Sequence, residues 1–155
     1  MKTYRFLINA IAALALITAV TGGVSYAAGK RGLVVIVNKA NATASVSKAE
    51  LAHLFLGKRK MWGSGEPVKV CDMAEAGEPE ERSAMGTFSQ NYLDRDLGTL
   101  KNYWIKMIFS GKGEPPVVFR KAEEVIRFVS EHQGGVGYVY EDQLNDQVRP
   151  VPVRD

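Results

Sequence analysis

The stretch from Ser47 to Val70, which reads SKAELAHLFLGKRKMWGSGEPVKV, constrains the fold of this chain more than any other. Ser47 and Glu50 have the S-x-x-E spacing of a capping box, so we expect a helix to start there. The next apolar residues recur at i, i+3 and i+4, which gives this helix one face that can pack on a core. These residues are Leu51, Leu54 and Phe55.

The second half of this stretch predicts the end of the helix and the start of a strand. Gly57 can take the left-handed conformation that terminates a helix, and the cations Lys58–Lys60 suit the negative end of the helix dipole. Trp62 then precedes a turn at Gly63–Gly65, and Val68–Val70 begins an alternating strand. The stretch therefore predicts a short helix, an aromatic residue that packs into the core, a turn and a strand.

Strand and helix patterns alternate along the rest of the chain. Leu33–Val37 is a continuous β-branched run, typical of a strand that is covered on both faces. Further strands are expected at 68–71, 136–140 and 148–153, with a short extended piece at 117–119. Helices are expected at 79–93, from the connector 94–98 to about Phe109, and at 122–132. This order predicts an α/β domain with a mixed sheet flanked by helices. Its core should include Leu54, Phe55, Trp62 and Trp104.

Residues 1–27 have the pattern of a secretory signal peptide. Lys2 and Arg5 form a positive region, Phe6–Val20 is an apolar segment, and Ser25–Ala27 is a cleavage site with small residues. An uncleaved membrane anchor is the alternative, although the apolar run is short for a span of about 20 residues. Cleavage would leave residues 28–155 as one periplasmic domain of 128 residues (155 − 27).

Composition argues against several roles. Residues 1–27 hold two basic and no acidic residues, so the remaining chain carries 18 basic and 17 acidic side chains. This balance gives no support to a nucleic-acid partner. Cys71 is the one cysteine, lies in an expected strand and can form no intramolecular disulfide. We interpret it as a small buried apolar residue, rather than as a reactive thiol or an intermolecular bridge.

The motif SKAELAHLFLGKRKMW, followed by GEPVKV, resembles the second lobe of phosphate-binding proteins that serve ABC transporters, a group of type II periplasmic binding proteins. The segments YWIKMIFSGKGEPP (Tyr103–Pro116) and GGVGYVY (Gly134–Tyr140) agree in order and spacing. The resemblance covers roughly Leu33–Val153 and implies the fold of one such lobe. Because the chain is too short for two lobes, the resemblance implies a single-lobe short form, with an ABC transporter or another envelope protein as its partner.

An oxyanion site is expected where Gly77–Phe88, GEPEERSAMGTF, opens a helix after a strand. The N-terminus of a helix presents free N–H groups and a positive dipole end to phosphate or sulfate. In the family this turn carries an Arg, an Asp and a Ser-Gly-Thr run that hold the anion. The resemblance assigns Arg82 to the Arg, and Ser83, Gly86 and Thr87 loosely to the Ser-Gly-Thr run.

The same turn departs from the family pattern. The Asp is absent, and two residues separate Ser83 from Gly86. Three acidic residues, at 78, 80 and 81, precede Arg82 and would repel an anion. A plain surface helix start is therefore the alternative interpretation of this segment.

Other chemistry has little support in the sequence. His53 and His132 have no cysteine or carboxylate at ligand spacing, so we expect no metal site. No nucleophile elbow, paired acid–base set or cofactor motif is present, and we expect no enzyme. Tyr103, Trp104 and Phe109 could form an aromatic binding stripe, although their helical spacing favours a place in the core.

Two functions therefore remain open. The first is an exported binding module for phosphate or a similar oxyanion. A lone lobe would offer half of the ligand contacts, so a second copy in a two-fold homodimer or a partner protein would supply the rest. The second function is that of an envelope accessory protein, which keeps the fold and binds no small ligand.

Overall fold

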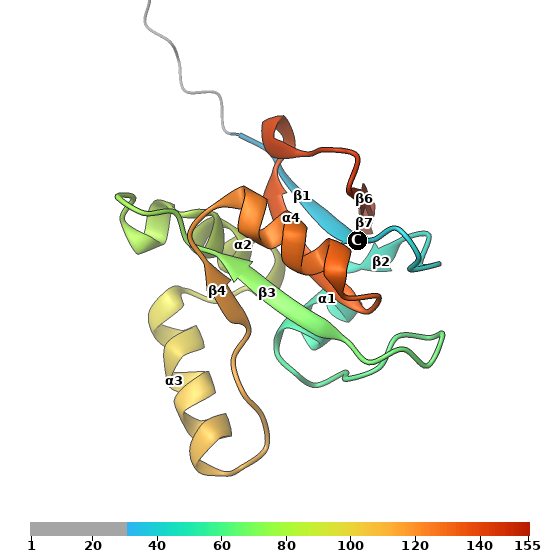
Figure 1. The fold of residues 1–155 in the computed structure, drawn as a ribbon. Helices are drawn as coiled ribbons and strands as arrows, with labels where there is room; N and C mark the ends of the chain where they lie inside the picture. Colours follow the sequence, from blue (N-terminus) through green and yellow to red (C-terminus); the bar gives the residue numbers. More distant parts are fainter. Residues whose placement is uncertain (1–30) are drawn as a thin grey trace, which may run out of the picture.

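The central sheet has five strands in the order β4-β3-β5-β1-β6 (Figure 1). In this computed structural model, which describes residues 31–155, β3, β4 and β5 run parallel, whereas β1 pairs antiparallel with both β5 and β6. The strands are β1 (Leu33–Asn38), β3 (Lys69–Met73), β4 (Val117–Phe119), β5 (Gly135–Tyr140) and β6 (Val148–Pro150). A separate two-stranded sheet pairs β2 (Val46–Ser47) with β7 (Val153–Arg154).

The helices lie on both faces of the central sheet, so the predicted mixed sheet flanked by helices is confirmed. α4 (Ala122–Glu131) packs across one face, and α1 (Lys48–Phe55) and α2 (Ala84–Leu93) lie behind the other (Figure 1). α3 (Leu97–Phe109) projects away from the body of the molecule. None of the helices within residues 31–155 has the length and apolar character that a transmembrane span requires.

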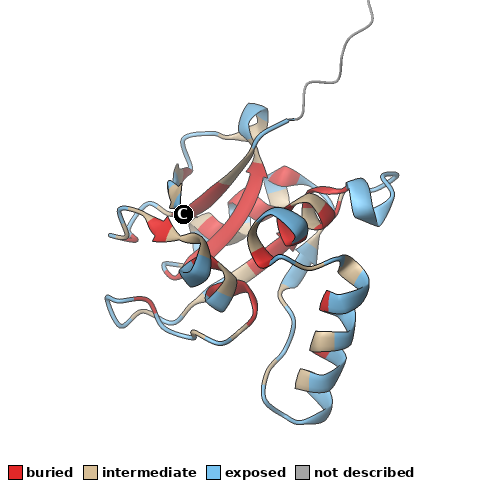
Figure 2. Ribbon diagram, turned by 180° about the vertical axis from the view of Figure 1, so that it is seen from behind, coloured by how far each residue is buried: buried red, intermediate tan, exposed pale blue. Residues whose placement is uncertain are grey.

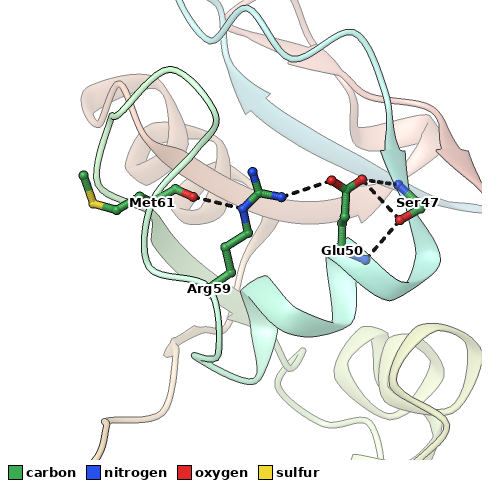
Figure 3. A network of polar contacts seen from close by, with 4 residues as sticks. All are labelled: Ser47, Glu50, Arg59 and Met61. Carbon is green, nitrogen blue, oxygen red and sulfur yellow. Dashed lines mark hydrogen bonds and ion pairs between the residues drawn. The ribbon is translucent and has the colours of Figure 1, made fainter.

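The start and end of α1 follow the prediction. The Ser47 hydroxyl accepts the Glu50 N–H at 3.1 Å, and the Glu50 carboxylate accepts the Ser47 N–H at 3.0 Å (Figure 3). Gly57 has a φ of 65°, the left-handed conformation expected after the helix. Within the basic run, Arg59 donates to the Glu50 carboxylate at 3.0 Å and to the Met61 carbonyl at 3.1 Å. A single ion pair therefore ties the chain after α1 to the start of α1.

The predicted core is confirmed, since Leu54, Phe55, Trp62 and Trp104 are all buried. The Trp62 indole N–H also donates to the Gly134 carbonyl at 2.9 Å, which anchors the loop before β3 to the start of β5. Beneath α1 and α2, the rings of Phe88 and Tyr138 stack with centroids 4.0 Å apart. Cys71 is buried in β3, and burial raises the pKa of its thiol, in agreement with a small apolar role.

Two expected elements differ from the structure. The helix expected at 79–93 begins only at Ala84, because Glu80–Arg82 forms a separate 3-10 turn, η1, and Ser83 caps the helix proper. The last expected strand, 148–153, is divided between two sheets, with β6 at the edge of the large sheet and β7 in the small one. The signal peptide predicted at residues 1–27 lies outside the described residues.

Candidate functional site

The carboxyl ends of β3, β4 and β5 meet at one edge of the sheet because these strands are parallel. The loops that follow them lead into η1 and α2, into α4, and into the 3-10 turn η2 (Glu141–Gln143). Ligands of open α/β sheets bind at this kind of edge, where helix N-termini also point. The turn predicted to bind an oxyanion therefore lies at the edge of the fold that is best suited to a ligand.

Ser83 uses its side chain to start α2. Its hydroxyl donates to the Glu80 carbonyl at 2.6 Å and accepts the Gly86 N–H at 3.2 Å. Both bonds are internal to the turn, and the residue is buried. Ser83 therefore acts as the N-cap of α2 and joins η1 to the helix, which is the usual role of serine at this position.

Gly86 has a steric role in the same turn. A Cβ at this position would lie 2.5 Å from the Glu80 carbonyl oxygen and 2.6 Å from that of Glu81. Only glycine lets η1 lie this close to the first turn of α2. Thr87 follows on the helix, half-buried, and its N–H donates to the Ser83 carbonyl at 3.0 Å.

Arg82 is the one exposed residue among the four predicted oxyanion ligands. Among residues 31–155 its guanidinium forms no ion pair, and its backbone N–H donates to the Pro79 carbonyl at 2.9 Å. The structure thus brings Arg82, Ser83, Gly86 and Thr87 into one turn. Of the four residues, Arg82 is exposed and Thr87 is half-buried, whereas Ser83 and Gly86 are buried.

Glu75 is the site residue that the sequence did not indicate. Its carboxylate accepts the Ala84 N–H at 2.9 Å and so places a negative charge at the positive end of α2. The next N–H group, that of Met85, lies in the same first turn of α2. Glu75 lies nine residues before the N–H that it binds, outside the spacing of any local capping motif.

Tyr140 lies near Glu75 at this edge, and Arg31 packs on the Tyr140 ring. The Arg31 guanidinium sits over the Tyr140 ring, 4.1 Å from its centroid, and lies 3.7 Å from the Asp142 carboxylate. Burial, followed by the neighbouring charge of Glu75, raises the pKa of Tyr140 to about 12, so its hydroxyl keeps its proton at neutral pH. A protonated phenol here can donate a hydrogen bond to an anion or to Glu75.

A second carboxyl group, that of Asp72, is buried just behind the edge. The Tyr138 hydroxyl donates to Asp72 at 2.9 Å and accepts the Met73 N–H at 3.3 Å. Burial raises the pKa of Asp72 to about 6, although the bond from Tyr138 opposes this shift. Within the part of the chain that the structure describes, no cluster of three or more His, Cys, Asp or Glu side chains is arranged to hold a metal.

Comparison with known structures identifies the fold. A phosphate transport receptor from Vibrio cholerae aligns with a TM-score of 0.54 at 16% identity, over 79% of this chain and 46% of its own. A substrate-binding protein from Clostridium perfringens, solved with bound phosphate, aligns with a TM-score of 0.59 at 15% identity. The alignment covers 79% of this chain and 45% of that protein. PstS from Borrelia burgdorferi aligns with a TM-score of 0.57 at 12% identity, over 79% of this chain and 47% of PstS.

The fold is that of one lobe of a PstS-like protein. The chain spans less than half the length of each of these solved chains, which fits a single PstS-like lobe. No protein-family model and no curated protein sequence matches the chain. At these low identities the PstS-like likeness concerns the fold, and the role of the site has to be argued from its own residues.

Proposed function

We propose that this chain is an exported, single-lobe binding module that takes phosphate or a similar oxyanion at the N-terminus of α2. The observation that carries the proposal is the place of this turn. The start of α2 and the exposed Arg82 lie at the carboxyl edge of the parallel strands, in a fold shared with a protein solved with bound phosphate. The Arg82 guanidinium and the Met85 N–H would donate to the anion.

Glu75 and the anion compete for the same positive end of α2 in this proposal. The carboxylate binds the Ala84 N–H in the structure described here, so an incoming phosphate has to displace it or bind beside it. Repulsion between the two negative charges makes binding weaker than in a site without such a carboxylate. We therefore expect a dissociation constant for phosphate in the millimolar rather than the micromolar range. This corresponds to a binding free energy of roughly 4 rather than 8 kcal/mol in magnitude.

A lone lobe also lacks the ligand donors that would come from the opposite side of a two-lobed cleft. We propose that a partner covers this edge, either an envelope protein such as an ABC transporter subunit or a second copy of the chain. Export to the periplasm would follow from the predicted signal peptide, residues 1–27.

Replacement of Arg82 tests the proposed site. The melting temperature of the wild type should rise with phosphate or sulfate, because a ligand that binds only the folded state stabilises it. Arg82→Ala should weaken phosphate binding by about ten- to a hundredfold, since a charge-assisted contact is worth roughly 1.5–3 kcal/mol. Arg82→Lys should restore part of it, because an ammonium cannot make the bidentate contact.

Arg127→Ala is the matched control, since Arg127 is an exposed arginine on α4. It removes the same charge and should leave the phosphate-dependent shift unchanged. An equal loss in both variants would mean that phosphate responds to overall charge and not to the α2 turn.

The second candidate function is an envelope accessory protein that keeps the fold without binding a small ligand. The bond from the Ala84 N–H to Glu75 favours it, because an internal anion already satisfies the positive end of α2. This function predicts no anion-dependent shift in the melting temperature of the wild type or of any Arg82 variant.

A further inference from the structure

α3 is apolar on two faces, and only one of them is covered. Leu100 and Trp104 are buried against the body. Ile105, Ile108 and Phe109, at i, i+3 and i+4, form a second apolar stripe beside the first and are 43%, 52% and 89% exposed, and Ile108 also lines the groove between α3 and the body. We call these three residues the outer stripe of α3. A soluble helix normally carries polar residues on such a face, so the outer stripe calls for a covering surface.

The charge along α3 and the turn after it is positive, with the acidic residues Asp96 and Glu114 just outside the two ends of this segment. Residues 97–113 contain Lys101, Lys106 and Lys112 and no acidic residue. Residues 31–155 as a whole carry 17 basic and 17 acidic side chains, so this excess is local. All three lysines are exposed, and none of them forms an ion pair within residues 31–155. The surface that covers the outer stripe should therefore be both apolar and negatively charged.

The shape of this region favours a broad surface over a small ligand. α3 projects from the body, and most of it is exposed, in contrast to the buried central sheet (Figure 2). A groove of about 710 Å³ separates α3 from the body, and its wall carries the basic residues Arg59, Lys60, Lys69 and Lys112 and one acidic residue, Glu114. Phe109 is the last residue of α3 and is 89% exposed.

A second copy of the chain suits this face poorly. In a two-fold dimer the same patch lies on both sides of the interface, so the lysines of one copy would meet those of the other. Like charges brought together in this way oppose association. Aromatic and aliphatic residues on one face of a helix, with lysines beside them, are instead typical of helices that lie in the headgroup region of a bilayer.

We propose that α3 docks on an anionic lipid bilayer, with the outer stripe in the headgroup region and Lys101, Lys106 and Lys112 on lipid phosphates. This surface is separate from the oxyanion turn at α2, and the proposal does not depend on phosphate binding. A lobe held at the membrane in this way would keep its sheet edge close to a membrane-embedded partner.

Sedimentation with lipid vesicles tests the docking. The full chain is expressed for export, and mass spectrometry determines its N-terminus, which we expect at Ala28. All variants are then compared with the same N-terminus. We expect binding to vesicles of equal parts phosphatidylglycerol and phosphatidylcholine, and little to pure phosphatidylcholine. Lys101→Gln with Lys106→Gln should lower the partition coefficient roughly 30-fold, at about 1 kcal/mol per lysine. Phe109→Ser should lower it roughly tenfold or more.

The control pair is Lys39→Gln with Arg127→Gln, which removes the same charge from exposed positions outside α3. An equal loss in this pair would overturn the proposal, as would the absence of binding to the anionic vesicles. Loss of a concentration-dependent dimer in Phe109→Ser, without vesicle binding by the wild type, would also overturn it and would assign α3 to self-association.

Tryptophan fluorescence tests whether α3, and not another segment, contacts the lipid. Phe109→Trp places an indole on the outer stripe, and brominated phosphatidylglycerol should quench its fluorescence. Gln90→Trp places an exposed indole on α2 and should be quenched little. Equal quenching in the two variants, each corrected for Trp62 and Trp104, would show that α3 is not the part that meets the lipid.

Discussion

At the scale of single residues, Asp72 is a buried carboxyl group whose pKa is changed by the fold. It lies near the end of β3, and its carboxylate accepts a hydrogen bond from the Tyr138 hydroxyl at 2.9 Å. Burial raises the pKa of Asp72 from an ordinary 3.8 to about 6. The folded protein therefore holds this proton more tightly than the unfolded chain does, and the charged carboxylate reduces stability above that pH.

Replacement of Asp72 with asparagine should remove this dependence on pH. Between about pH 4 and 6 the folded state binds the proton that the unfolded state has lost, so the contribution of Asp72 to stability falls as pH rises. At pH 7 Asp72→Asn should be more stable than the wild type by on the order of 3 kcal/mol, and at pH 4 the two should be similar. Urea unfolding of both proteins from pH 4 to 7.5 measures this difference. If the free energies of unfolding of the two proteins differed by the same amount at every pH, Asp72 would titrate as an ordinary carboxyl group.

At the scale of elements, α1 could be predicted from the sequence and the start of α2 could not. The capping box at Ser47 and the glycine after α1 act within a few residues, and sequence spacing carries such information. α2 depends on a carboxylate nine residues upstream and on a glycine that makes room for η1, and both are tertiary contacts. Pro79 and the two glutamates after it resemble a first helical turn, although they form a separate 3-10 turn.

Gly86→Ala tests whether η1 has to pack closely on α2. Alanine is the better helix former by about 1 kcal/mol, so a gain in stability would be expected on an open helix. The backbone carbonyls of Glu80 and Glu81 leave no room for a Cβ, and we expect a loss of about 1–3 kcal/mol in the free energy of unfolding. Gly98→Ala is the matched control in the first turn of α3, where a Cβ would meet only the Asp96 side chain, 3.2 Å away. A stabilised Gly86→Ala variant would contradict the packing described for η1.

At the scale of the whole molecule, the order of strands and helices and most of the core followed from the apolar patterns. Trp104 was correctly placed in the core, whereas Phe109, five residues later, is almost fully exposed. The two lie on different faces of α3, and periodicity alone does not tell which face the body covers. The resemblance identified the lobe but not the contact of Glu75 with the start of α2, because Glu75 reaches that turn only through the fold.

A titration of the wild type and two Glu75 variants with phosphate, followed by calorimetry at pH 7, tests the central claim most directly. Glu75→Gln removes the charge that competes with the anion, and Glu75→Ala also frees the Ala84 N–H. Glu81→Gln, which removes a charge from η1 without touching that N–H, is the control.

The predicted result is an affinity that rises from the wild type to Glu75→Gln to Glu75→Ala, by at least about tenfold overall, with little change in Glu81→Gln. The absence of phosphate binding in the wild type and in both Glu75 variants would contradict the account. It would leave a PstS-like lobe without an oxyanion site at α2.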